Sequence, residues 1–252
     1  MRRDERRTLL IVVIAGVAGP ILVMPAIYVL GLWLAPPRPV PALTRVPATL
    51  SDALWARADG GPVKQLQPIN PLTFVEMRVC RYRAAAIDDP IARGQRRAEC
   101  MKLLPAIQAA DYLSGVHMRD SDAATGGFRE GISQFSTAAW VTRSWTAEEL
   151  LATLAERGDF GFGWRGADAA AHGYFARDAE ALAIPQAALL AGLIGDRGID
   201  PWCNASSAIE TRRQILDHMR DNGAIDAATF ESADRSPLGL TDPPPQHHPC
   251  RQ

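Results

Sequence analysis

The stretch Phe160 to Ile194, FGFGWRGADAAAHGYFARDAEALAIPQAALLAGLI, decides the fold of this chain. It predicts two helices with a short break. The first lies around Ala167 to Phe175, where small alanine side chains come first and the large side chains of Tyr174 and Phe175 follow. The second begins near Pro185, whose missing N–H has no helical partner in a first turn, and it runs apolar through Leu193. Small residues on these faces let helix backbones approach closely, so the stretch predicts a tightly packed helical hairpin.

The order of residues in this stretch says more than its periodicity. A glycine-rich turn leads into an alanine-rich helix that ends in Tyr-Phe, and a second helix reads AALLAGL. This series resembles the family 51 glycosyltransferases, the peptidoglycan-polymerising domain of class A penicillin-binding proteins and of monofunctional transglycosylases. The resemblance extends from about Trp145 to Asp226. The matching positions are Gly161, Gly163, Gly166, Ala169 to Ala171, Tyr174, Phe175, Leu182, Ala187 to Leu193, Asp200, Pro201, Asn204, Arg212, Arg213 and the segment QILDHMRDNGAID.

The resemblance implies a mainly α, lysozyme-like transglycosylase domain with a smaller lobe near the membrane. Composition agrees, because alanine-rich segments with few β-branched runs favour helices. The segment His117 to Gly127 is polar and ends in glycine, which predicts a loop with His117 facing solvent. The predicted helices are Ala92 to Ala110 with an interruption at Pro105, Gly131 to Val141, Ala147 to Arg157, Asp168 to Phe175, Pro185 to Ile194, Ser206 to Asn222 and Ala227 to Ala233.

The N-terminal region predicts a membrane anchor behind which this domain lies. Four arginines precede Thr8, and the run from Thr8 to Leu34 carries no charge. That run is longer than the roughly 20 residues that a membrane-spanning helix needs, and longer than a signal-peptide core of about 7 to 15 residues. The arginines place the N-terminus in the cytoplasm and the domain outside the inner membrane. A buried core helix is the alternative interpretation of this run.

Five segments follow from these patterns. Residues 1–7 form a cytoplasmic tail and residues 8–35 the transmembrane anchor. Residues 36–50 include the proline-rich PPRPVPALTRVP, which predicts a stiff extended spacer that lifts the domain off the membrane. Residues 51–240 form the transglycosylase-like domain, and residues 241–252 form a loose C-terminal tail. The formal net charge of −1 gives no indication of a nucleic-acid partner.

The chain has four cysteines, Cys80, Cys100, Cys203 and Cys250, all on the side predicted to be exported. In an oxidising compartment they permit two disulfides with three connectivities, and the pairing of neighbours in sequence, Cys80 with Cys100 and Cys203 with Cys250, is the local choice. A metal site formed by His247, His248 and Cys250 is an alternative, although DPPPQHHPCRQ has the composition of a loose tail. We predict no metal site.

The first family motif, E-D-x-x-F-x-x-H-x-G, contains a glutamate that acts as general base on the acceptor sugar. Its nearest match is Phe74 to Asp88, FVEMRVCRYRAAAID, where Glu76 is the candidate base and Arg78 a candidate substrate-binding cation. Met77 replaces the aspartate, and the phenylalanine, histidine and glycine are missing. A surface glutamate is the alternative interpretation of Glu76.

The other motifs keep their helices and lose their polar centres. The second, G-G-S-T-I-T-Q-Q, has no counterpart, and its place retains only a helix with the polar Asp111. In the third, R-K-x-x-E, the glutamate falls on Gln134, which cannot ionise, and Glu130 is a substitute one helical turn earlier. In the fourth, K-x-x-I-L-E-x-Y-L-N, the glutamate falls on Ala152. Thr146 still caps the helix that carries this last motif.

The resemblance implies that lipid II and the growing glycan strand bind in a groove. There a base deprotonates the acceptor hydroxyl while cations, with or without a divalent metal ion, hold the departing pyrophosphate. Such chemistry needs at least one placed carboxylate and several cations. The candidate substrate-binding cations are Arg78, Arg129 and Arg143, each of which is otherwise a solvated surface arginine. If the protein is active, a divalent cation is the cofactor that this chemistry allows.

Three functional hypotheses remain open from the sequence. The first is a divergent peptidoglycan glycosyltransferase that acts on lipid II and glycan strands at the inner membrane. The second is a non-catalytic protein of the same fold that binds or scaffolds other cell-envelope proteins. The third is a lysozyme-like, glycan-cleaving enzyme, which needs a carboxyl group of raised pKa in a cleft. Arginines that converge on a groove carboxylate would distinguish the catalytic hypotheses from the second.

Overall fold

The protein is described by a computed structural model that covers residues 23, 25–69, 79–80, 82–89, 92, 96, 100, 106–123, 126–195, 199–244, 247 and 250. Within these residues the only β pairing is an isolated bridge between Asp159 and Arg165, so the predicted mainly α class is confirmed. The helices whose two ends both lie among these residues include α2 (Ala48–Arg57), α5 (Ile107–Asp120), α6 (Gly127–Ser144), α7 (Ala147–Arg157), α8 (Ala167–Phe175), the short η1 (Ala179–Ala181), α9 (Ile184–Leu193), α10 (Ala205–Asp221) and α11 (Ala227–Asp234).

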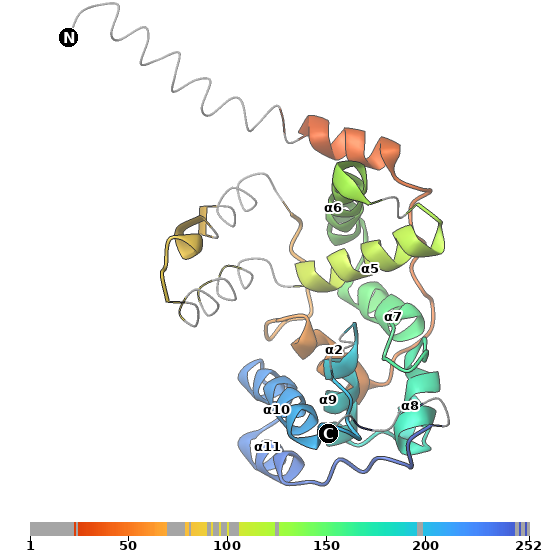
Figure 1. The fold of residues 1–252 in the computed structure, drawn as a ribbon, viewed down its shortest axis with the longest axis vertical. Helices are drawn as coiled ribbons and strands as arrows, with labels where there is room; N and C mark the ends of the chain where they lie inside the picture. Colours follow the sequence, from red (N-terminus) through yellow and green to blue (C-terminus); the bar gives the residue numbers. More distant parts are fainter. Residues whose placement is uncertain are drawn as a thin grey trace, which may run out of the picture.

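Helix α9 is the centre of the fold. Every residue from Ala187 to Leu193 is buried, as expected of a helix that is apolar on all sides. It contacts α2, α8, α10 and α11, and Figure 1 shows it enclosed by these helices. The hairpin predicted from residues 160–194 is therefore present and lies at the centre of the core.

The helix boundaries from α7 onwards follow local sequence signals. Thr146 accepts a hydrogen bond from the Glu149 N–H, and the Glu149 carboxylate accepts one from the Thr146 N–H, which makes the predicted cap a capping box. The Asn204 and Asp226 side chains cap α10 and α11 by accepting one hydrogen bond each, from the N–H groups of Ser207 and Thr229. The predicted helices in this region agree with the observed ones to within two residues.

The preceding region differs from the expectations at α2, at the predicted loop and at the ends of α6. Helix α2 lies partly inside the segment predicted to be a spacer, and no helix was predicted there. Helix α5 begins at Ile107, after Ala106 with its left-handed φ of 65°, next to the interruption predicted at Pro105. It runs to Asp120, through much of the predicted loop, because Val116 and Met118 are buried on its inner face while polar residues face outward. Helix α6 extends the predicted Gly131 to Val141 at both ends.

The N-terminal residues pack on the domain instead of standing clear of it. Residues 25–34 are helical and approach α6 so closely that a Cβ at Gly31 would lie 2.0 Å from the Ser136 hydroxyl. Residues 36–47 are extended, as predicted, but the Ala42 N–H donates to Thr153 Oγ1 (2.9 Å) and the Pro37 carbonyl lies 2.7 Å from His117 Nε2. His117 is thus on a helix and contacts the chain, which corrects its predicted place in a solvent-facing loop.

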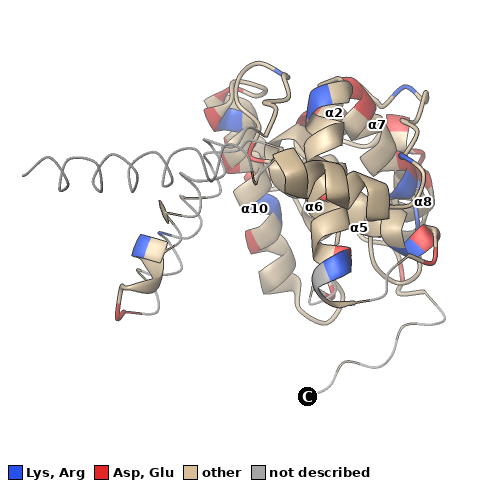
Figure 2. Cartoon of the chain, turned by 90° about the horizontal axis from the view of Figure 1, so that it is seen from above, with Lys and Arg blue, Asp and Glu red and all other residues tan. Residues whose placement is uncertain are grey.

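No helix among the described residues is long and apolar enough to cross a membrane, and most of the run from Thr8 to Leu34 lies outside those residues. Figure 2 shows that acidic and basic residues are mixed over the helical body, and that charges in α6 lie near its ends. The middle of α6, residues 131–142, has no charged side chain. This uncharged part includes Ser136, the contact of Gly31.

The disulfides pair as the local choice predicted, Cys80 with Cys100 and Cys203 with Cys250. The expectation of a loose C-terminal tail is wrong for its described residues. The Thr241 N–H donates to the Tyr174 carbonyl (2.8 Å), and the Trp202 indole donates to the Thr241 carbonyl (2.8 Å). The end of the chain is consequently tied to the start of α10 and the end of α8.

Candidate functional site

A cavity of about 610 Å³ lies where α2, α5, α6, α7 and the end of α9 converge. The helices supply mostly apolar walls, and the charged side chains of its lining are Arg57 and Asp111. Such a cavity, mainly apolar with a few polar groups, is typical of small-ligand and substrate sites. Its described lining is Leu54, Arg57, Ala58, Ile107, Gln108, Ala109, Asp111, Tyr112, Phe135, Ala138, Leu154, Ile194 and Gly195.

Asp111 provides the carboxylate of this lining. It lies in the first turns of α5, and it is exposed to solvent at the cavity. Burial by the surrounding protein raises the pKa of Asp111 above its ordinary value of 3.8, while a hydrogen bond with the Gln134 side chain acts in the opposite direction. A carboxyl group of raised pKa in a cavity is a candidate acid or base.

Gln134, the predicted replacement for a family glutamate, lies beside Asp111 rather than in the cavity lining. Its Nε2 donates to the Asp111 backbone carbonyl at 3.2 Å. A Cβ at Gly115 would lie 3.3 Å from this nitrogen, so the glycine gives the Gln134 side chain its room between α5 and α6. The amide of Gln134 therefore contacts the backbone of Asp111 and carries no charge, and its role as a site residue stays a prediction.

The far wall is fixed by Tyr112 and Gly195. The Asp159 N–H donates to the Tyr112 hydroxyl (2.8 Å), and the Gly195 N–H donates to the Asp159 carbonyl (2.8 Å). Gly195 has φ of 72°, and a Cβ there would lie 2.7 Å from Tyr112 Cε2. Only glycine fits both the backbone conformation and the tyrosine ring. The end of α9 and the start of the α7–α8 connection thereby hold the cavity open on this side.

The sequence analysis overlooked the carboxylate of Asp59 at the end of α2. Ala58 lines the cavity, and Asp59 lies next to it, 3.3 Å from His218 Nδ1 and 3.5 Å from Gln108 Nε2. Asp59 also lines a smaller neighbouring cavity of about 260 Å³. Asp59 is thus a carboxylate beside the candidate site that the sequence analysis did not consider. Helix α2, at whose end it lies, was not predicted, so no local signal indicated it.

Glu130 and Arg129 lie in the first turn of α6 and are not in the cavity lining. The Glu130 carboxylate accepts a hydrogen bond from the N–H of Gly126, the residue that precedes α6. This contact stabilises the start of the helix, where a negative charge is favourable. Arg129 is exposed. Both stay predictions as site residues.

Arg143 lies at the other end of α6, in a separate cavity of about 590 Å³ that also contains Lys64 and Glu148. Its guanidinium donates to the carbonyl oxygens of Ala139 and Ile69 and lies 5.1 Å from the Tyr28 ring centroid. These contacts hold the N-terminal helix and the chain before α5 against α6. Its predicted role in substrate binding remains a prediction.

Two further predicted site residues, Glu76 and Arg78, lie outside the described residues. Ala152, at the glutamate position of the fourth motif, is 5% exposed within α7. It packs in the core as a methyl group, so this position supplies no carboxylate to the site.

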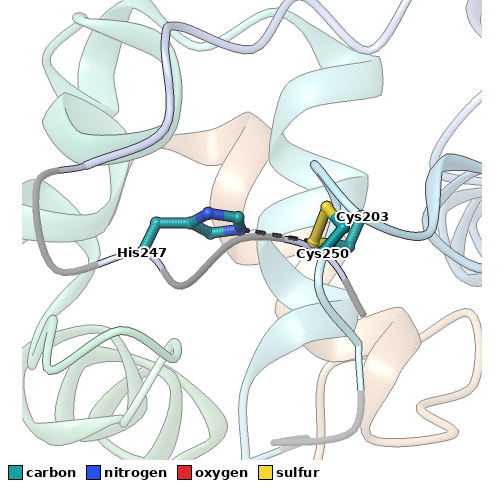
Figure 3. Close-up of side chains that lie close together, drawn as sticks. All are labelled: Cys203, His247 and Cys250. Carbon is teal, nitrogen blue, oxygen red and sulfur yellow. Dashed lines mark hydrogen bonds between the residues drawn. A yellow bond between two sulfur atoms is a disulfide. The ribbon is translucent and has the colours of Figure 1, made fainter. Parts of the chain in front are cut away.

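One group of possible metal ligands is present among the described residues, at the C-terminal end of the chain. Cys203, His247 and Cys250 place one ligand atom each within 4.8 Å of one another, and Figure 3 shows the His247 ring facing the two sulfurs. The two cysteines form a disulfide and therefore do not offer thiolates in this state. The group involves two of the residues, His247 and Cys250, that the sequence offered as a metal alternative.

Comparisons with known proteins agree with this architecture. Residues 117–220 match the family described as Transglycosylase. Penicillin-binding protein 1A of Streptococcus oralis and that of Streptococcus pneumoniae (strain ATCC BAA-255 / R6) are each 30% identical to this chain over 112 residues, or 42% of its length. The aligned part is 18% and 16% of these relatives, so the chain corresponds to a small part of each.

These matches confirm the resemblance to the transglycosylase domain of penicillin-binding proteins, and this chain contains a divergent transglycosylase domain. The matched residues begin within α5 and include all of α6 to α9 and nearly all of α10. Arg57, Ala58 and Asp111 of the cavity precede the match. The match therefore covers the scaffold and leaves an important part of the candidate site outside.

Proposed function

We propose that this chain binds lipid II or nascent glycan strands in the cavity between α2, α5 and α6, as a glycosyltransferase-like protein of the cell envelope with reduced catalytic machinery. The transglycosylase domain supports a role at peptidoglycan. The cavity supports binding, since it combines apolar walls and the Tyr112 and Phe135 rings with the charges of Arg57 and Asp111. Aromatic faces and a few placed polar groups suit a saccharide bearing a charged group.

One observation carries this proposal: the cavity is present, while two positions at which the family motifs have a glutamate carry no carboxylate. These positions are Gln134 and Ala152. General acid–base catalysis contributes roughly 10²- to 10⁴-fold to rate, so a site short of these groups can still bind its ligand while turnover falls.

Asp111 favours a second candidate function, an enzyme that transfers or cleaves glycan with this residue as its acid or base. Desolvation by the surrounding protein raises the pKa of Asp111, and Asp111 and Arg57 both line the same cavity. Lone carboxyl groups of raised pKa serve as general acids in glycan cleavage. In this case Asp111 takes the role that the sequence analysis gave to Glu76.

The proposal places the chain at the inner membrane, with residues 8–34 as its anchor and the domain on the outer side. The four arginines before Thr8 support this orientation. The packing of residues 25–34 on the uncharged middle of α6 supports a domain held close to the membrane. Interactions with other cell-envelope proteins belong to this proposal as well.

Lipid II binding and glycan synthesis by the purified full-length protein in detergent test these functions together. The wild type is compared with Asp111→Asn, Glu76→Gln and Gln134→Glu, beside an active polymerase as control. We expect the wild type to bind lipid II, to make little or no polymer, and to lose about 10-fold or more in affinity on Asp111→Asn, since a hydrogen bond to a charged group contributes about 1.5–3 kcal/mol.

The other outcomes of this experiment distinguish the two candidate functions. Polymer or cleaved glycan that is lost in Asp111→Asn would favour the second candidate, and polymer lost only in Glu76→Gln would return the base to that residue. Absence of lipid II and glycan binding from a folded wild type would contradict the proposal. Polymer gained by Gln134→Glu would identify the missing carboxylate as the cause of low turnover.

A further inference from the structure

Asp200, Cys203, His247 and Cys250 lie close together near the C-terminal end of the described chain, and we call this group the corner. Aromatic rings pack against its histidine, in addition to the disulfide that joins its two cysteines. Trp202 and Phe162 place their ring centroids 5.5 and 5.6 Å from that of His247. The His247 side chain is only 8% exposed, although it belongs to the last residues of the chain. Its ring is therefore held in one orientation by packing, as Figure 3 shows for its position beside the sulfurs.

Two polar contacts converge on one atom of this histidine. His247 Nε2 lies 2.9 Å from Asp200 Oδ2 and 3.6 Å from Cys203 Sγ. The other oxygen of Asp200 accepts hydrogen bonds from the N–H groups of Trp202 and Cys203, at 3.0 and 3.1 Å, which fixes the carboxylate before the start of α10. One ligand atom each of Cys203, His247 and Cys250 thus lies within 4.8 Å of the others, and the Asp200 carboxylate contacts the histidine of this group.

These positions are close to those of a tetrahedral zinc site. Zinc binds thiolate at about 2.3 Å and imidazole at about 2.0–2.1 Å, which places sulfur and nitrogen about 3.5 Å apart in a tetrahedron. The observed separation of Cys203 Sγ and His247 Nε2 is 3.6 Å. The two sulfurs are bonded in the disulfide, so they must separate after reduction before both can bind one ion, and the Asp200 carboxylate must move from its contact with the histidine to bind the ion as well.

We propose that this corner is a Zn²⁺ site that replaces the Cys203–Cys250 disulfide when that disulfide is reduced by a dithiol. The ligands are the two thiolates, His247 Nε2 and Asp200 Oδ2. A mixture of sulfur, nitrogen and oxygen ligands in this geometry suits Zn²⁺ among the divalent cations. Because both cysteines are exposed, a reductant reaches the disulfide without unfolding of the core.

Replacement of the disulfide by zinc takes two steps, reduction and metal binding. In the first, the dithiol is oxidised to its own disulfide, the S–S bond of the protein breaks, and the two electrons and two protons form two cysteine thiols. In the second, Zn²⁺ binds as both thiols release their protons to solvent, while neutral His247 keeps its proton on Nδ1. The ion then joins the same segments that the disulfide joined, the start of α10 and the end of the chain.

The second disulfide, Cys80–Cys100, provides a matched control within the same molecule. It has the same redox chemistry, but no metal-ligand group that includes these cysteines is found among the described residues. Reduction of both disulfides should therefore create one zinc site. The double variant Cys80→Ser with Cys100→Ser should leave zinc binding unchanged.

The test is zinc titration of the full-length protein in detergent against a chromophoric chelator, before and after reduction with a phosphine reductant that does not itself bind zinc as a thiol. We expect about one equivalent of Zn²⁺ per reduced chain and affinity at least about 10-fold lower for the oxidised chain. His247→Gln and Cys203→Ser should each weaken binding by about 10-fold or more in the reduced chain. Cobalt in place of zinc should give the visible absorption of a tetrahedral, thiolate-bound ion.

Circular dichroism of each variant shows whether weaker zinc binding comes from loss of a ligand or from loss of the fold. His247→Gln keeps both disulfides when oxidised, so its folding is checked in the oxidised state, without reduction. Absence of zinc binding from the folded, reduced wild type would overturn the proposal. Equal affinity of the wild type and the variant lacking both Cys203 and Cys250 would also overturn it, and so would loss of binding in the Cys80 and Cys100 control.

Discussion

The α7–α10 region and the cavity walls contributed by α2, α5 and α6 differ in what their side chains do. In the first, residues such as Ala170 and Leu190 have no exposed surface and fill the core. In the second, Ala58, Asp111 and Gln134 lie at or beside a cavity, where polar chemistry decides their use. In the first region, the space available in the core limits which side chains fit. In the second region, the chemistry of the bound ligand decides which side chains are useful. A transglycosylase scaffold is therefore compatible with a site whose catalytic groups have changed.

The largest effect is expected from a cavity created in the scaffold. Leu190→Ala in α9 should lower the free energy of unfolding by about 3 kcal/mol, because a fully buried leucine is removed from a helix that neighbours α2 and α10. Urea denaturation followed by circular dichroism measures the change. Val63→Ala, at a side chain that is 69% exposed, should cost less than about 0.5 kcal/mol. Equal costs for the two variants would deny the difference between core and periphery.

Gly195→Ala tests the point where the scaffold meets the cavity. We expect a loss of about 2 kcal/mol, partly from its left-handed φ of 72° and partly from the contact of the new methyl group with Tyr112. Gly163→Ala is the matched control, since Gly163 also has positive φ (80°) but open space around its Cβ position. The control should lose only about 1 kcal/mol. Thermal unfolding of both variants separates steric crowding by Tyr112 from backbone strain. Equal losses of stability in the two variants would show that Tyr112 does not crowd position 195, which would contradict the described packing of this cavity wall.

Asp111→Asn should have the smallest effect on stability and the opposite sign. Burial disfavours the charged form of Asp111, so its folded-state pKa lies above 3.8 and its ionisation destabilises the fold as pH rises through that raised pKa. Asparagine should therefore stabilise the protein at pH 7, by less than about 1 kcal/mol because the cavity is open to solvent. The gain should vanish below about pH 3.8, where aspartate is protonated in both states. A destabilised variant at pH 7 would show that the charge is instead favoured in the fold.

The sequence predicted the scaffold well because its signals are local. The caps at Thr146 and Asn204, the proline at Pro185 and the alanine-rich faces fix helix ends and packing by themselves. The two disulfides were also predicted as the local pairing. By contrast, α2 was missed because Pro47 and the proline-rich run before it obscured its start, where no side chain caps the helix.

The site was predicted only in part, because it depends on tertiary contacts. Spacing in the sequence predicted Gln134 as a site residue, and the structure places it beside Asp111, which the sequence analysis noticed only as a polar residue of a lost motif. The pKa of Asp111 is raised by desolvation from protein around the cavity, which several helices line and no single segment forms. The predicted loop at His117 to Gly127 failed for the same reason, since the burial of Val116 and Met118 comes from neighbouring helices.

Lipid II binding by a variant with a blocked cavity tests the central claim most directly, that the scaffold has kept a glycan-binding cavity while losing catalytic groups. Ala58→Phe fills the cavity without a change of charge, and Arg57→Ala removes its cation with little risk to the core. Glu148→Gln, at an exposed residue, alters the separate cavity near Arg143 as a control. We predict affinity at least about 10-fold lower for both cavity variants and unchanged for the control. Wild-type affinity in a folded Ala58→Phe and in Arg57→Ala would contradict the account.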